Sequence, residues 1–127
     1  MKNKIKMTFD EWRKDKNLSL KSEKILQLID KDLVSYANDT RRLNSRISYG
    51  KYRTSAVILF SKSNYVKLQI KKILFENETI NWSKFGFINP SDREHCKKGF
   101  KELNITKYSQ YNEELKKFLT NVLKKVI

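Results

Sequence analysis

The chain has 127 residues, of which 39% are hydrophobic, and this length and composition indicate one folded domain rather than a disordered chain. Its formal net charge of +14, from 28 basic and 14 acidic residues, predicts a polyanionic partner. The single cysteine excludes an internal disulfide and no apolar run is long enough to cross a membrane, so we expect a soluble cytoplasmic protein without a membrane partner.

Two helices are the first predicted elements. Met1–Lys6 is basic but leads into no apolar run, so we expect no signal peptide. Thr8 and Glu11 have the spacing of a capping box, which begins a short helix. Ser19 can cap a second helix that reaches about Asn38, and in it apolar residues recur every three or four positions.

The apolar pattern then changes to the period of a strand. Asn38–Ser45 is polar and predicts a turn. A strand begins near Arg46, Gly50 is expected to mark a bulge, and a second strand runs through Ala56–Phe60. Strict alternation over Tyr65–Lys71 predicts a third, half-buried strand.

The C-terminal part combines one ambiguous stretch with three predicted elements. Ile80–Ile88 is apolar and aromatic without a clear period. Ser91–Glu94 has capping-box spacing and predicts a short helix that Gly99 can end. Leu103–Ile105 indicates a last strand, and a closing helix with an apolar stripe begins near Gln110.

Together these elements predict an α+β fold. We expect a small, mostly antiparallel sheet of three to four strands, with the N-terminal and C-terminal helices packed on one face. No internal repeat or linker divides the chain, so we expect one domain over residues 1–127, with residues 1–18 as a peripheral N-terminal helix.

The positive charge is unevenly distributed along the chain. Residues 40–75, here called the acid-free segment, contain nine Lys or Arg and no Asp or Glu, whereas residues 1–39 carry a net charge of +2 and residues 76–127 carry +3. A general bias toward lysine would spread over the whole chain. The acid-free segment therefore predicts a surface for a polyanion, and a solvated sheet edge protected by lysines is the alternative interpretation.

The acid-free segment supplies the candidate binding residues. Outward-facing Lys67, Gln69 and Lys71 would lie about 7 Å apart on their strand, close to the spacing of successive phosphates. Arginine binds phosphate through two hydrogen bonds, and a tyrosine between the cations can stack on an unpaired base. The predicted nucleic-acid-binding residues are Arg41, Arg42, Arg46, Lys51, Tyr52, Arg53, Tyr65, Lys67 and Lys71.

No combination of residues favours catalysis. His95 and Cys96 are the only histidine and cysteine, but helix neighbours point about 100° apart and two ligands cannot complete a zinc site. The run Gln69–Lys71 is similar to the (D/E)-x-K element of metal-dependent nucleases, yet Gln stands where the carboxylate ligand should be. We therefore predict a protein without catalytic residues, metal or cofactor.

Several short runs carry a resemblance to one family. They are Lys21–Ile25 at a helix start, Asn64–Ile70 in a strand, His95, Gly99 and Leu103–Ile105 before the last helix. Over about residues 20–127 the chain resembles the small domain of unknown function called "predicted transport protein", which occurs at the C-terminal end of some bacterial restriction-type proteins. The resemblance implies an association with DNA-targeting defence systems and carries no activity.

The sequence therefore predicts a small, non-catalytic protein that binds DNA or RNA with little sequence dependence. One alternative is an inhibitor or adaptor, encoded by a phage or mobile element, whose basic face docks on a protein or a protein–nucleic acid complex. Another is a divergent metal-dependent nuclease. Binding of free nucleic acid at physiological salt separates the first two, and Mg²⁺-dependent cleavage that requires Lys71 would indicate the third.

Overall fold

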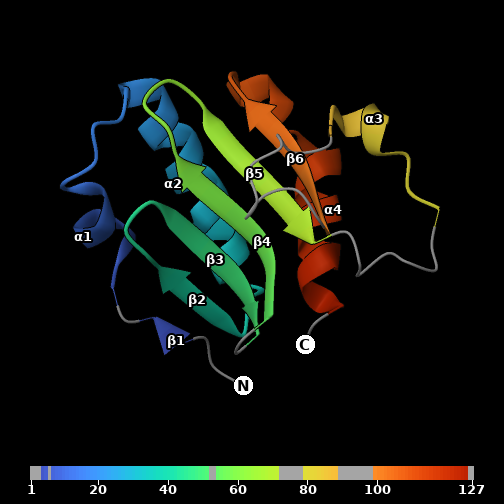
Figure 1. The fold of residues 1–127 in the computed structure, drawn as a ribbon, viewed down its shortest axis with the longest axis horizontal. Coiled ribbons are helices and arrows are strands. Elements are labelled where there is room, and N and C mark those ends of the chain that lie inside the picture. Colours follow the sequence, from blue (N-terminus) through green and yellow to red (C-terminus); the bar gives the residue numbers. More distant parts are fainter. Residues whose placement is uncertain (1–3, 6, 52–53, 72–78, 89–98, 126–127) are drawn as a thin grey trace.

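The computed structural model describes residues 4–5, 7–51, 54–71, 79–88 and 99–125 of the chain (Figure 1). Within these residues the strands are β1 (Lys4–Ile5), β2 (Asp39–Arg42), β3 (Arg46–Lys51), β4 (Thr54–Ser61), β5 (Val66–Lys71) and β6 (Phe100–Ile105). The helices are α1 (Phe9–Arg13), α2 (Leu20–Val34), α3 (Trp82–Phe85) and α4 (Glu113–Lys124), and a 3₁₀ turn spans Tyr108–Gln110.

The strands form one sheet in the order of the chain, β1-β2-β3-β4-β5-β6. Each strand from β2 to β6 is antiparallel to the next, and β1 pairs with β2 in parallel. The α+β fold is confirmed, but the described residues contain more strands than the three to four predicted. β1 was not predicted, and β2 lies in the stretch expected to be a turn, because the sequence Asp-Thr-Arg-Arg shows no apolar alternation.

Helices α2 and α4 pack against each other and cover the same face of the sheet (Figure 1). The side chain of Ser19 caps α2, and that of Asn112 caps α4. The predicted capping box of Thr8 and Glu11 is present at the start of α1. Helix α1 contacts the turn between β2 and β3, because the buried indole of Trp12 donates a hydrogen bond of 2.6 Å to the carbonyl oxygen of Leu43.

The register between β3 and β4 shifts between Tyr49 and Gly50, where a bulge was predicted, but the extra residue is Ala56 on β4 rather than Gly50 itself. The ambiguous stretch Ile80–Ile88 forms the short helix α3, whose aromatic rings pack against Phe118 of α4. The helix predicted from Ser91–Glu94 lies outside the described residues. No helix among the described residues is long and apolar enough to cross a membrane.

The core lies between the sheet and the layer of α2 and α4. It is built from the apolar face of each helix and from every second residue of the central strands. The alternate positions of those strands point to the opposite face of the sheet, here called the outer face. This face is the one turned toward the viewer in Figure 1, and four of the predicted binding residues lie on it, namely Arg41, Arg46, Lys67 and Lys71. Lys51, at the end of β3, shares the helix-side positions of Ile47 and Tyr49.

Candidate nucleic-acid interface

The antiparallel ladders align outer-face residues of neighbouring strands in rows that run across the sheet. The central row contains Arg41, Ser48, Ile58, Gln69 and Glu102. The next row, here called the end row, lies two residues along each strand and contains Arg46, Phe60, Lys67 and Asn104. Because neighbouring strands are about 4.8 Å apart, residues two strands apart in one row are separated by about 10 Å.

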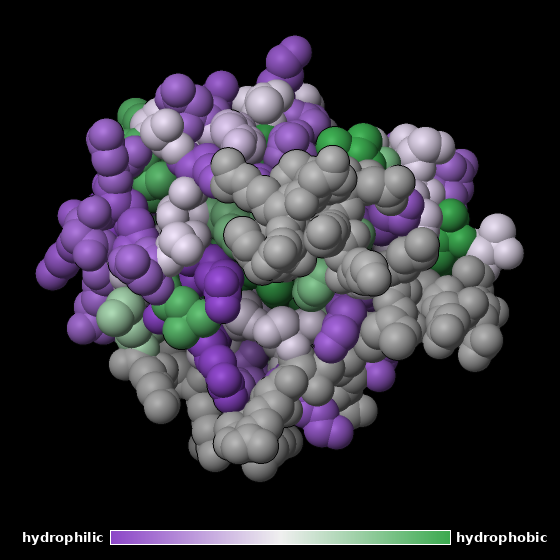
Figure 2. All heavy atoms as spheres, viewed as in Figure 1, coloured by the Kyte–Doolittle hydropathy of each residue, from purple (hydrophilic) through white to green (hydrophobic). Residues whose placement is uncertain are grey.

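Three predicted cations are accessible to solvent and available for an anion. Arg46 and Lys51 are exposed at the two ends of β3, and Lys71 is half-buried at the end of β5. Among the residues that the structure describes, no carboxylate lies within ion-pair distance of any of the three. Figure 2 shows the molecule from the side of the outer face, with hydrophilic side chains gathered over α1 and the β2–β3 turn.

Two other predicted cations lie on the outer face but have carboxylate partners. Arg41 Nε is 2.9 Å from Asp39 Oδ2, and Lys67 Nζ is 3.9 Å from Glu102 Oε1. Asp39 and Glu102 lie outside the acid-free segment in sequence, and strand pairing brings Glu102 beside it. The side chain of Arg41 is 45% exposed, whereas that of Lys67 is only 13% exposed, so Arg41 is the more accessible of the two.

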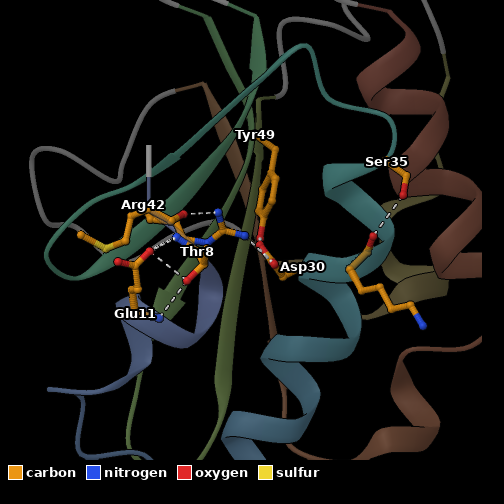
Figure 3. Close-up of polar contacts among 8 residues, drawn as sticks. Thr8, Glu11, Asp30, Ser35, Arg42 and Tyr49 are labelled. Carbon is orange, nitrogen blue, oxygen red and sulfur yellow. Dashed lines mark hydrogen bonds and ion pairs between the residues drawn. The ribbon is translucent and has the colours of Figure 1, made fainter. Parts of the chain in front are cut away.

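The prediction that Arg42 binds nucleic acid is wrong, because its side chain points to the helix side of the sheet and is 3% exposed. Its Nη2 donates to Asp30 Oδ2 at 2.6 Å, and its Nη1 donates to the carbonyl oxygen of Met7 at 2.7 Å (Figure 3). The hydroxyl of Tyr49 donates to the other oxygen of the same carboxylate. Arg42 therefore holds β2 against α2 and is not placed to meet a phosphate.

Gln69 lies on the outer face as predicted, but it is buried. Its Nε2 donates a hydrogen bond of 3.0 Å to Glu102 Oε1, the carboxylate that also faces Lys67. Among the described residues no group of three His, Cys, Asp or Glu side chains is arranged to hold a metal ion. The middle of the outer face is thus occupied by a polar network within the protein, and the accessible cations surround it.

Phe60 is the outer-face residue that the sequence analysis missed. It lies in the end row between Arg46 on β3 and Lys67 on β5, and it is half-buried. Lys67 Nζ lies 5.6 Å from the centroid of its ring. Tyr65, a predicted stacking residue, is also half-buried and lies two residues before Lys67. Tyr52, Arg53, His95 and Cys96 lie outside the described residues.

The fold and this surface together define an α+β protein with a helix layer on one face of a sheet and basic side chains around the other. No family model, no curated protein and no solved structure matches the chain. The functional argument therefore depends on the residues themselves.

Proposed function

We propose that this protein is a non-catalytic nucleic-acid-binding protein that uses the outer face of its sheet. The observation that carries the proposal is the accessibility of Arg46 and Lys71 on this face, together with that of Lys51 at the end of β3, which alternation places at the rim of the sheet on the helix side. None of the three has a carboxylate partner among the described residues. Cations of this kind contact phosphates through charge, so binding would be steeply salt-dependent and largely independent of sequence. A cytoplasmic location and a role beside DNA-targeting defence systems belong to the same proposal.

Arg41 would add a further phosphate contact. Its side chain is 45% exposed although it pairs with Asp39, which is 15% exposed, so the guanidinium can meet a phosphate while it keeps its carboxylate partner. Lys67 is less suited, because its ammonium is largely buried beside Glu102. The proposed phosphate-binding set is therefore Arg46, Lys51 and Lys71, assisted by Arg41.

The test is fluorescence anisotropy with labelled single-stranded and duplex DNA and RNA between 0.05 and 0.3 M salt. The variant Arg46→Ala/Lys51→Ala/Lys71→Ala removes the three accessible cations. The matched control Lys24→Ala/Lys31→Ala/Lys117→Ala removes three exposed lysines from α2 and α4 on the other side of the sheet. Both variants lower the formal net charge from +14 to +11, since each removes three positive charges.

The expected loss follows from counterion release. Each phosphate contact contributes about 0.7 to the slope of log K against log salt for single strands. Three lost contacts reduce the slope by about 2 and, at about 0.15 M salt, weaken binding by about 50-fold. The control variant should keep the wild-type slope, because its lysines lie away from the ligand.

Two results would contradict the proposal. In the first, the wild type does not bind nucleic acid at physiological salt. In the second, both triple variants lose affinity equally, so that only total charge matters. A labelled poly-glutamate peptide serves as a second probe, and tighter binding of this peptide than of nucleic acid would favour a protein partner with an acidic surface.

A further inference from the structure

We propose that the end row is a stacking site for an unpaired base, so that the ligand of the outer face is single-stranded nucleic acid. This inference depends on the proposed function and specifies its ligand. The site consists of the aromatic ring of Phe60, the cation Arg46 beside it in the ladder and the ring of Tyr65, which lies in the turn directly before β5.

Phe60 is placed as a contact residue rather than as a core residue. Its neighbours on β4, such as Leu59, are completely buried on the helix side, whereas Phe60 is half-buried on the outer face and is not part of the hydrophobic core. The accessible part of the ring is apolar surface, and covering it from water is favourable by about 25 cal/mol per Å². A nucleobase is a suitable cover, because every base offers a flat π-face.

The neighbours of the ring fit this role. Lys67 Nζ lies 5.6 Å from the ring centroid and 3.9 Å from Glu102, so its cation–π contact holds the ring in place before a ligand arrives. Arg46 is exposed on the adjacent strand, about 5 Å away in the ladder, where its guanidinium can bind the phosphate of the stacked nucleotide. Asn104, also exposed in this row, offers an amide to a base edge.

A second aromatic residue lies next to the end row. The β4–β5 ladder ends at the pair Ser61–Val66, and Tyr65 is the residue directly before β5, in the turn that joins the two strands. It is half-buried, so part of its ring is accessible beside the strand end. A single strand whose base stacks on Phe60 could therefore continue toward this second ring.

A duplex cannot use these rings. Its bases are stacked on one another and expose only their edges in the grooves, and the described part of the outer face presents strands rather than a helix that could enter a major groove. A duplex would contact the surrounding cations alone. The charge of the outer face accounts for attraction to either form, and the aromatic rings account for a preference for the single strand.

The test compares Phe60→Leu with a matched control, using a labelled 12-nucleotide oligothymidine strand and a 12-base-pair duplex. The control is Tyr36→Leu, because the ring of Tyr36 is 40% exposed and has Lys124 Nζ at 5.6 Å from its centroid, but it follows α2 on the other side of the sheet. Both leucine variants keep an apolar side chain, and circular dichroism with thermal unfolding checks that each is folded. Phe60→Trp tests whether a larger ring restores binding.

We expect Phe60→Leu to weaken binding of the single strand by about 5- to 150-fold, the range that loss of one stacked base gives, and to change duplex binding less than twofold. Tyr36→Leu should change neither, and Phe60→Trp should bind the single strand at least as tightly as the wild type. Equal binding of both probes by Phe60→Leu and by the wild type would overturn the stacking site while leaving the proposed function intact. Failure of the wild type to bind either probe would overturn the proposed function itself.

Discussion

Replacing Arg42 with methionine perturbs the buried network that joins β2 to α2. The side chain of Asp30 is 7% exposed, and its carboxylate accepts one hydrogen bond from Arg42 at 2.6 Å and one from Tyr49. Without Arg42 the negative charge of Asp30 remains buried beside a single neutral donor. Breaking a buried ion pair from one side typically costs about 3–5 kcal/mol.

Two smaller effects adjust this magnitude. The hydrogen bond from Arg42 to the carbonyl oxygen of Met7 is lost, which costs about 1 kcal/mol. In the other direction, Arg42 Nε is buried and has no hydrogen-bond partner within the described part of the chain, so the native state already carries a penalty that methionine removes. We expect a net loss of about 3–4 kcal/mol, a large fraction of the 5–15 kcal/mol typical of a domain. For a chain of this length the midpoint temperature should fall by about 10–15 °C.

Urea unfolding followed by far-ultraviolet circular dichroism measures this loss. Arg46→Met is the control, because Arg46 is exposed and should change the free energy of unfolding by less than about 0.5 kcal/mol. The double variant Asp30→Leu/Arg42→Met replaces both charges with apolar groups and should recover most of the lost stability. The reasoning is refuted if Arg42→Met loses less than about 1 kcal/mol, or if the double variant is less stable than the single one.

Two further predictions concern backbone conformation and alkaline pH. Gly86 ends α3 at φ +90°, and a Cβ atom there would lie 3.3 Å from Leu103 Cδ1. Gly86→Ala should therefore lower the free energy of unfolding in urea by about 1–2 kcal/mol, and an unchanged midpoint would contradict this. Burial, followed by the neighbouring aspartates, raises the pKa of Tyr49 and of Tyr111 above the usual 10. Because the folded state keeps both phenols neutral, the stability that these two tyrosines contribute is fully present below pH 10 and is lost as the pH rises above it. The urea midpoint should therefore drop more steeply above pH 10 for the wild type than for Tyr49→Phe/Tyr111→Phe.

The elements with a clear apolar period were predictable from the sequence, and the polar ones were not. The alternation over Tyr65–Lys71 corresponds to β5, and Thr8 and Ser19 cap the helices as predicted. β2 has no such pattern, because its inward-facing positions are Thr40 and Arg42. Arg42 can occupy an inward position only because Asp30 neutralises it, and a partner 12 residues away leaves no periodic signal in the sequence.

The candidate surface was predicted in part for a similar reason. Arg46, Lys51 and Lys71 are accessible, as the acid-free segment predicts. Phe60 was missed because Ala56–Phe60 is a continuous apolar run, in which neither face of the strand can be recognised from composition. Only the pairing of Phe60 with Arg46 and Lys67 assigns the ring to the outer face.

The distribution of charge in space differs from its distribution along the chain, and this difference bears on how the protein would bind an anion. Asp30, Asp39 and Glu102 each meet a cation of the acid-free segment, so a segment without carboxylates is not a surface without them. Even if every one of the 14 acidic residues paired with a cation, 14 of the 28 basic residues would remain unpaired, since 28 minus 14 leaves 14. Such an excess destabilises the compact state through repulsion, and a polyanion on the outer face would relieve that repulsion. The charges that oppose folding of the free chain are therefore the same charges that would favour its complex.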